Sequence, residues 1–298
     1  METPKQQNTA ETQVNQQELS DQHSTMSSTE GASLSGIPSG FDALDKVTCG
    51  WQKSELVIIG ALSAMGKTAF ILSMAKNIAI DKRIPTAIFS LERTCKVLTN
   101  FLLANISEID WDKIRNDNLT DEERNCINSK IKDIQSAPLY IDDTSPITVD
   151  ELCCKAHTLV HEKEVKLIVI DELALLYAPA EYRNDREQET DYIVKRLKEL
   201  SVELDIPILL NNKLIHGTAP SPRRVPQYSY FYYLDSMKYA DRICLFYRPA
   251  FYNIFIDPET GEDLHDTAFF YIVTPYQESE TTPRVRLHFR RDLCRFDN

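Results

Sequence analysis

The sequence lacks long hydrophobic runs: no stretch approaches the ~18 consecutive apolar residues that a membrane-spanning helix needs. The N-terminus also lacks a charged segment followed by an apolar one, so we expect no secretory signal. The seven cysteines lack the paired spacing of a zinc site, and reduced, buried thiols are favoured over disulfides or zinc. These absences predict a cytoplasmic protein without a membrane segment.

An excess of basic residues is also missing. Lysine and arginine total 33 against 45 aspartate and glutamate residues, which gives a formal net charge of −12. This balance argues against broad, non-specific binding of nucleic acid through bulk charge, but it leaves room for a local basic strip.

Residues 1–35 have almost no aliphatic side chains and are dominated by Gln, Ser, Thr, Asn and Glu. Such a segment buries too little apolar surface to offset the entropy of ordering, so we predict a disordered tail. It is either a solvated tail or a linker or tether for a partner. The folded domain is predicted to span residues 36–298.

A phosphate-binding loop is predicted early in this domain. The apolar run 56–59 is typical of a buried strand, and residues 69–80 have helical composition. Between them lies a tight turn ending in Gly66-Lys67-Thr68, where backbone N–H groups and a helix N-terminus offer positive potential to a phosphate. We expect Lys67 to reach the β- and γ-phosphates and Thr68 to bind Mg²⁺. Ala61 stands where the usual pattern has glycine, and an ordinary turn is the alternative interpretation.

Two acidic residues follow predicted strands. Glu92 comes directly after the strand predicted at 85–91, where a carboxylate can orient and deprotonate the water that attacks a γ-phosphate. A solvent-exposed glutamate that caps the next helix is the alternative. Asp171 closes the apolar run 167–170, and such an aspartate is the usual partner of a phosphate loop, holding Mg²⁺ through water.

Strands and helices alternate along most of the chain. Further strands are predicted at 139–141, 167–172, 206–210, 243–247, 268–273 and 285–289, and further helices at 95–106, 121–135, 148–163 and 186–204. This order predicts an α/β fold with a mostly parallel twisted sheet, helices on both faces and antiparallel strands at the C-terminal edge. The basic residues Lys195, Arg196 and Lys198 of the last helix form either a solvated face or a subunit contact.

Five motifs occur in an order that resembles one family. They read GIPSGFDALD (36–45), SAMGKTAF (63–70), IFSLE (88–92), APLYIDDT (137–144) and LIVID (167–171). Together they resemble the C-terminal, RecA-like P-loop motor domain of the bacterial replicative helicase DnaB, over residues 36–298.

The resemblance implies a ring-shaped, hexameric ATPase that couples hydrolysis to movement along single-stranded DNA, with its sites between subunits. It implies ATP and Mg²⁺ as cofactors, and single-stranded DNA and replication proteins as partners. Glu92 and Lys67 would be catalytic, and Thr68 and Asp171 would hold the metal. The implied nucleotide-binding residues are Ser63, Ala64, Met65, Gly66, Lys67, Thr68, Ala69 and Arg248.

The chain departs from the family at four places. Residues 171–174 read DELA where the family has Asp-Tyr-Leu-Gln, and residues 212–214 read NKL where it has Ser-Gln-Leu. Residues 229–234 read SYFYYL in place of Asp-Leu-Arg-Glu-Ser-Gly, and residues 276–278 read YQE in place of Lys-Gln-Arg. Glu278 replaces an arginine that reaches the neighbour's γ-phosphate, a change worth roughly 10³–10⁵ in rate. Arg248, Arg284 and Arg286 are either a displaced finger or surface charges. The family's N-terminal collar domain is expected to be missing, with the tail in its place.

Three functions remain open at this stage. The first is a DnaB-type helicase or translocase. The second is a degenerate relative that binds ATP but hydrolyses it poorly. Such a relative would serve as a regulatory, loading or accessory factor in a replication or mobile-element complex. The third is a signalling ATPase that acts only through protein contacts. The aromatic residues Tyr228, Tyr230, Phe231, Tyr232 and Tyr233 either stack on bases or are buried.

Overall fold

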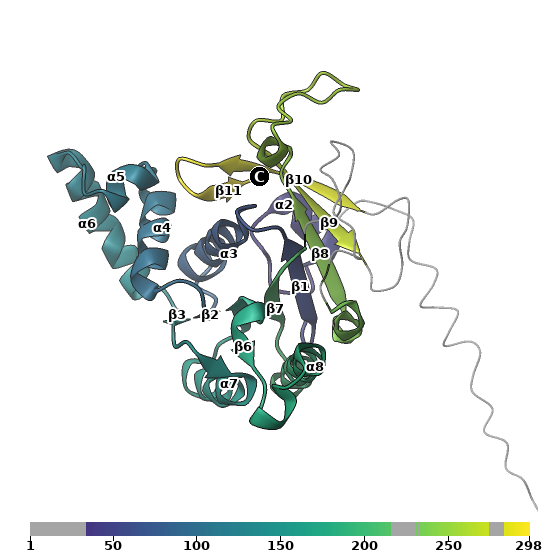
Figure 1. Cartoon of the computed structure of the whole chain (residues 1–298). Coiled ribbons are helices and arrows are strands. Elements are labelled where there is room, and N and C mark those ends of the chain that lie inside the picture. The colour runs from purple at the N-terminus through teal and green to yellow at the C-terminus, as the bar shows by residue number, and fades with distance from the viewer. Residues whose placement is uncertain (1–33, 216–230, 232, 274–282) are drawn as a thin grey trace, which may run out of the picture. The chain divides into compact units, whose positions relative to one another are not determined.

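The computed structural model describes residues 34–215, 231, 233–273 and 283–298. A nine-stranded sheet organises these residues, in the order β11-β10-β9-β8-β1-β7-β5-β2-β3 (Figure 1). The six strands from β8 to β3 are parallel, while β9, β10 and β11 each pair antiparallel. The predicted fold class, including the antiparallel C-terminal edge, is therefore confirmed.

The strands are β1 (Leu56–Ala61), β2 (Thr86–Ser90), β3 (Leu139–Asp142), β5 (Leu167–Asp171), β7 (Ile208–Lys213), β8 (Arg242–Tyr247), β9 (Thr267–Val273), β10 (Arg284–Arg290) and β11 (Arg295–Asp297), with β4 (Ile147–Thr148) and β6 (Leu176–Tyr177) in a separate pair. The α-helices are α2 (Asp42–Thr48), α3 (Lys67–Ala75), α4 (Cys95–Ser107), α5 (Trp111–Arg115), α6 (Asp121–Ser136), α7 (Val149–Lys163) and α8 (Arg186–Leu204).

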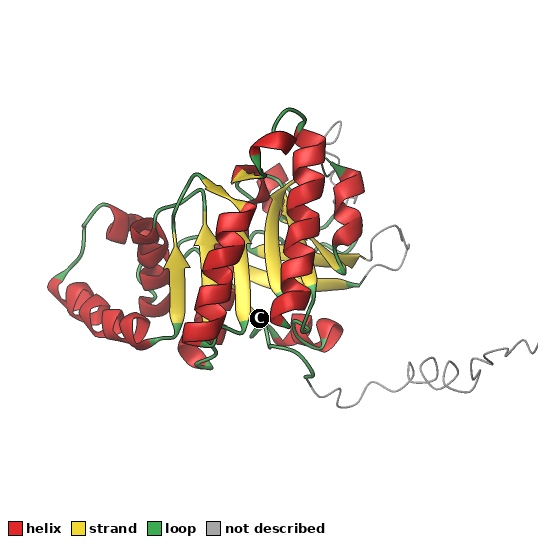
Figure 2. Cartoon of the chain, turned by 90° about the horizontal axis from the view of Figure 1, so that it is seen from below, coloured by secondary structure: helices red, strands yellow, loops and turns green. Residues whose placement is uncertain are grey.

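The central strands are covered on both faces. Every residue of β1, β2 and β5 is buried, as expected of parallel strands between two helical layers. Figure 2 shows α7 and α8 lying across one face of the sheet, and α3 lies on the opposite face. The carboxyl ends of β1, β2 and β5 therefore meet at one edge, where ligand sites of such sheets are found.

An aromatic cluster fixes α3 to the sheet. The ring of Phe70 lies 5.3 Å from Phe41, 4.9 Å from Phe270 and 6.0 Å from Phe296, measured between centroids. All four rings are buried. Offset and edge-on aromatic pairs add to the free energy gained from area burial, so the cluster holds the first turn of α3 in a defined position.

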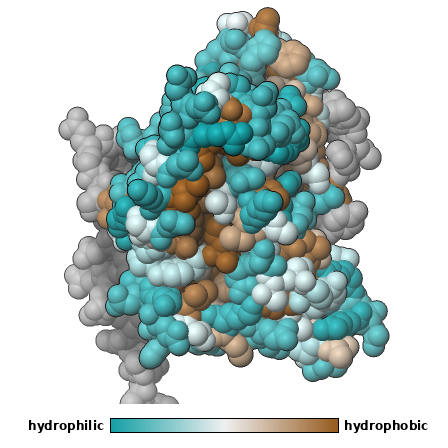
Figure 3. All heavy atoms as spheres, turned by 90° about the vertical axis from the view of Figure 1, so that its left-hand side faces the viewer, coloured by the Kyte–Doolittle hydropathy of each residue, from teal (hydrophilic) through white to brown (hydrophobic). Residues whose placement is uncertain are grey.

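A helical insert, α4 to α6, extends beyond the sheet and has a small core of its own, formed by Leu103, Ile109 and Ile127. It lies beside β3, the edge strand. A cavity of about 650 Å³ runs along β3, with Leu139, Ile141 and Leu159 among its lining residues. Figure 3, which views the molecule from this side, shows a band of apolar side chains flanked by polar ones.

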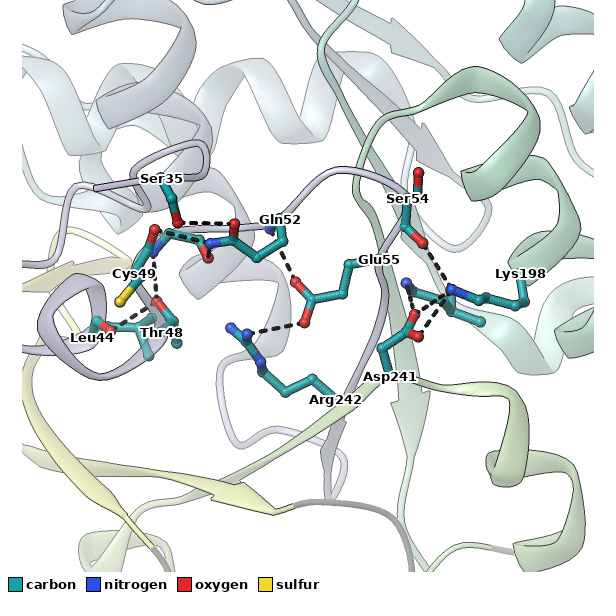
Figure 4. A network of polar contacts seen from close by, with 12 residues as sticks. Ser35, Leu44, Thr48, Cys49, Gln52, Ser54, Glu55, Lys198, Asp241 and Arg242 are labelled. Carbon is teal, nitrogen blue, oxygen red and sulfur yellow. Dashed lines mark hydrogen bonds and ion pairs between the residues drawn. The ribbon is translucent and has the colours of Figure 1, made fainter. Parts of the chain in front are cut away.

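A polar network ties together the other end of the sheet, where β1 and β8 begin (Figure 4). Glu55 pairs with Arg242 at 3.0 Å, and Lys198 of α8 pairs with Asp241 at 2.7 Å. Asp241 also accepts a 2.7 Å hydrogen bond from the backbone N–H of Leu56. These contacts fix the start of β1 against β8 and α8.

The structure differs from the sequence-based assignment in details. The helix predicted at 69–80 begins at Lys67 and continues after Ala75 as a π-helix over Lys76–Asp81, and strand β11 was not predicted. All seven cysteines are free thiols; Cys153 is buried while its neighbour Cys154 is exposed. Across the residues that the structure describes, none of the helices combines the length and the apolar character that crossing a membrane requires.

Candidate functional site

The loop between β1 and α3 has the geometry of an anion site. Gly66 precedes the first residue of α3 with φ of 101°, a conformation that side chains with a Cβ rarely adopt. The N-cap residue, Gly66, has no side chain with which to cap this helix, and the first turn contains no acidic residue. The N–H groups and the positive end of the helix dipole are therefore left for an external anion such as phosphate.

The Thr68 side chain meets the end of strand β5. Its hydroxyl donates a 2.9 Å hydrogen bond to Oδ2 of Asp171, which lies at the end of β5. The other carboxylate oxygen, Oδ1, accepts a 2.8 Å hydrogen bond from Nδ2 of Asn211 on β7. Asp171 is buried and thus has its orientation set from two sides. The structure brings together the two residues predicted to hold a metal, and adds Asn211, which was not predicted.

Lys67 is buried with only 9% of its side chain exposed, and it faces a carboxylate. Its ammonium lies 3.7 Å from Oε2 of Glu172, which is 12% exposed, and donates a 3.3 Å hydrogen bond to the carbonyl of Ala61. Burial raises the pKa of Glu172, the ammonium of Lys67 opposes this shift, and Asp171 and Glu92 reinforce it. In the sequence, Glu172 stands out only as a departure from the family. Its position directly after Asp171 was the signal that it lies in the site.

Glu92 is exposed and lines a cavity beside the phosphate loop. Its exposure agrees with the alternative interpretation, but the capping of the next helix that this interpretation assigned to Glu92 is made by another residue. Asp143 takes that position, because its Oδ2 accepts a 2.7 Å hydrogen bond from the backbone N–H of Cys95 at the start of α4. The carboxylate of Glu92 is thus left facing the cavity.

The cavity has a volume of about 960 Å³. Among its lining residues are Ser63, Ala64, Gly66, Lys67, Thr68, Ala69, Glu92, Glu172, Lys213, Arg248 and Phe289. The guanidinium of Arg248 lies 3.9 Å from the ring centroid of Phe289, a cation–π contact. Burial, together with the nearby charge of Arg291, lowers the pKa of Arg248 to about 10. Arg248 therefore lies where the sequence placed it, and Phe289 was missed.

Other predicted residues lie elsewhere. The side chain of Met65 is buried in the core, so any contact of this residue with a ligand would be through its backbone. The guanidinium of Arg284 covers the ring of Phe269 at 4.6 Å, and Arg286 pairs with Glu262. These contacts favour the interpretation of both arginines as charges held on β10.

The structure describes only some of the aromatic residues between positions 228 and 233. Phe231 is buried and its ring packs on Gly60, where an added Cβ would come within 2.5 Å of the ring. Base stacking is therefore wrong for Phe231. Tyr228, Tyr230 and Tyr232 lie outside the described residues, as does the stretch 276–278 that occupies the finger position.

Lys195 of α8 is exposed, as expected of a solvated face, but the other two predicted basic residues of this helix form ion pairs. Arg196 pairs with Glu203 at 2.8 Å, and Lys198 belongs to the network at the start of β1. Both cations are thus engaged within the chain.

Comparisons with known proteins identify the relatives of this chain. A family profile described as "DnaB-like helicase C terminal domain" matches residues 36–298. The chain is 30% identical over 266 residues to "Replicative DNA helicase DnaB" of Geobacillus stearothermophilus, covering 89% of this chain and 57% of that protein. It is 34% identical over 278 residues to the protein of the same name from Pasteurella multocida, covering 92% and 58%. The chain thus spans somewhat more than half the length of these relatives.

Two solved structures share the fold. "ATPase Domain of G40P" superposes with a TM-score of 0.79 at 24% identity, covering 97% of this chain and 99% of that chain. A DnaB-like replicative helicase, described with its interactions with primase, superposes with a TM-score of 0.77 at 24% identity, covering 97% and 67%. With the family profile and the relatives at 30% identity or more, these findings show that the chain belongs to the family of DnaB-like helicase C-terminal ATPase domains.

Proposed function

We propose that this protein binds ATP with Mg²⁺ at the cavity beside the phosphate loop and couples its hydrolysis to movement along single-stranded DNA during replication. One observation carries the proposal: the Thr68 hydroxyl at the start of α3 meets the buried carboxylate of Asp171 at 2.9 Å. A hydroxyl and a carboxylate fixed at a phosphate loop are the protein's share of a nucleotide–magnesium site. We expect the protein to act in the cytoplasm, as a homo-oligomeric ring or in an assembly with replication proteins.

The residues present fit ATP. The cavity of about 960 Å³ lies within the range of small-ligand sites, and one end of it offers the unpaired N-terminus of α3. Lys67 supplies a cation for the β- and γ-phosphates, and the guanidinium of Arg248, which lies on the buried ring of Phe289, supplies a flat surface for a base. The described parts of the chain contain no cluster of three or more His, Cys, Asp or Glu side chains that could hold a metal. This fits Mg²⁺, which takes one or two protein oxygens and completes its shell with phosphate and water.

In the proposed reaction, Thr68 and Asp171 would hold Mg²⁺, which neutralises charge on the phosphates when it is bound. The α3 N-terminus and Lys67 bind the phosphate oxygens and orient them. Glu92, exposed at the cavity wall, accepts the proton of the attacking water through its carboxylate. Asn211 keeps Asp171 in the orientation that serves Thr68.

A second candidate is a relative that binds ATP and hydrolyses it poorly, acting as a regulatory, loading or accessory subunit. Two observations favour it. Glu172 forms an ion pair with Lys67, the cation meant for the phosphates, and the sequence has Glu278 where the family places its arginine finger. A signalling ATPase that acts only through protein contacts is the third candidate.

Steady-state ATP turnover, measured with and without single-stranded DNA, separates these candidates. We expect turnover that DNA stimulates and that Lys67→Ala abolishes. Nucleotide binding with negligible turnover would instead support the second candidate. ATP turnover that DNA does not alter would support the third. Native mass spectrometry with nucleotide provides an independent check, since monomers alone would contradict a site shared between subunits.

A further inference from the structure

Glu172 and Lys67 form an ion pair inside the proposed nucleotide site. The two side chains come from different elements, since Lys67 is the first residue of α3 and Glu172 follows β5. Both are largely removed from solvent, with 9% and 12% of their side chains exposed. A pair buried to this degree is screened much less by water and salt than a surface pair.

The pair is held loosely. The distance of 3.7 Å from Nζ to Oε2 exceeds that of a charge-assisted hydrogen bond, and the bond from Lys67 to the Ala61 carbonyl is also long, at 3.3 Å. By contrast, the Thr68–Asp171 bond beside it measures 2.9 Å. Lys67 is thus neutralised but not strongly fixed, so a better anion can displace its partner.

We propose that Glu172 competes with the nucleotide's β- and γ-phosphates for Lys67, and thereby sets how tightly this protein binds nucleotides that carry them. The inference rests on the proposed function as an ATP-binding protein. In the nucleotide-free protein Glu172 satisfies the ammonium; when phosphate enters, Lys67 turns to it and Glu172 is released. Glu172 is therefore a positioning residue that acts through Lys67.

The surroundings of Glu172 favour such an exchange. Lys213 at the end of β7 lines the same cavity and offers Glu172 a second cation. Glu172 therefore keeps a possible counter-charge after Lys67 leaves it.

The test compares dissociation constants of ATP, ADP and AMP for the wild type and for Glu172→Gln, measured by isothermal titration calorimetry. We expect Glu172→Gln to bind ATP and ADP about tenfold more tightly, a difference of 1.4 kcal/mol. AMP has no β- or γ-phosphate to receive Lys67, so its affinity should stay unchanged. Asp112→Asn is the matched control, because it removes a carboxylate that lines the same cavity and pairs with Arg115 rather than with Lys67.

Three outcomes would overturn the inference: equal ATP affinities in the wild type and Glu172→Gln, an equal gain for AMP, or a gain that persists in the Lys67→Ala background. If Glu172→Gln does not fold, Glu172→Asp replaces it, since the shorter side chain withdraws the carboxylate from Lys67. The binding data distinguish a failure of this inference from a failure of the proposed function. ATP binding that Lys67→Ala abolishes and Glu172→Gln leaves unchanged defeats only this inference, whereas no nucleotide binding in any variant defeats both.

Discussion

Asn211 donates a 2.8 Å hydrogen bond to Asp171 across the adjacent strands β7 and β5, and this bond orients the carboxylate that receives the Thr68 hydroxyl. We predict that Asn211→Ala raises the Mg²⁺ concentration needed for half-maximal ATP turnover by about 10–100-fold, the usual effect of removing a group that orients a metal ligand. Asn212→Ala is the control, because that neighbouring amide contacts Met237 instead. An unchanged Mg²⁺ requirement in Asn211→Ala would contradict the role.

Glu92 is expected to act on the proton of the attacking water. Glu92→Gln keeps the size of the side chain but removes its basicity, so turnover should fall about 10²–10⁴-fold. The affinity for ATP should change little, because Glu92 is not the partner of Lys67. Single-turnover hydrolysis and equilibrium binding measured on one preparation separate these two effects. Turnover at the wild-type rate would move the role of base to another residue.

Phe289 and Arg248 are expected to receive the base of the nucleotide. Phe289→Ala removes the buried ring that supports the Arg248 guanidinium, so the stacking of the base on Arg248 should weaken. Such stacking is typically worth about 1–3 kcal/mol, and the dissociation constant of ATP should rise about tenfold or more. Inorganic triphosphate, which has no base, should bind Phe289→Ala and the wild type alike. Phe289→Tyr keeps the ring and should keep the ATP affinity. Equal losses for ATP and triphosphate would show that Phe289 supports the phosphate loop instead.

Gly60 leaves room for the ring of Phe231. Gly60→Ala places a Cβ 2.5 Å from that ring, and we expect overpacking to lower the free energy of unfolding by about 1–3 kcal/mol. Truncating the ring in Gly60→Ala/Phe231→Ala should remove this clash, so the two substitutions should cost less together than the sum of their separate costs. Urea unfolding of the four proteins measures the coupling, and additive costs would contradict the predicted contact.

Glu55 gives a pH dependence of known sign. Burial raises its pKa above the usual 4.5, although the ion pair with Arg242 opposes this shift. Because the folded state holds the proton more tightly, the stability due to Glu55 is present below the unfolded pKa. It is lost as pH rises through the folded pKa. The stability of the wild type relative to Glu55→Gln should therefore fall as pH rises above about 4.5.

Asp205 provides a control with the opposite sign. Its exposed carboxylate accepts hydrogen bonds from Lys53 and Ser54, and these lower its pKa. The stability of the wild type relative to Asp205→Asn should be lost as pH falls through the folded pKa. Chemical unfolding from about pH 2 to 8 compares both pairs, since the loss at Asp205 occurs below its usual pKa of 3.8. Parallel curves for the wild type and Glu55→Gln would refute the effect of Glu55.

Local patterns in the sequence were enough to predict most of the strands and helices, and to predict the phosphate loop and its acidic partners. Strands buried on both faces must be continuous apolar runs, which is why β1, β2 and β5 could be located without a structure. Helices α6 and α7 carry capping boxes, Thr120 with Glu123 and Thr148 with Glu151, which fix their starts through neighbours in the chain. Lys67, Thr68, Glu92 and Asp171 were found because each follows directly on a predicted strand or its turn.

The tertiary structure alone decided which residues complete that site. Asn211 reaches Asp171 because β7 lies between β1 and β5 in the sheet, although it follows both in the chain. Phe289 reaches Arg248 because β10 is linked to β8 through β9. Strand order results from long-range packing, which no short stretch of sequence encodes. The sequence by itself therefore identified a phosphate loop and its acidic partners, and the fold determined that Glu172 faces Lys67 there.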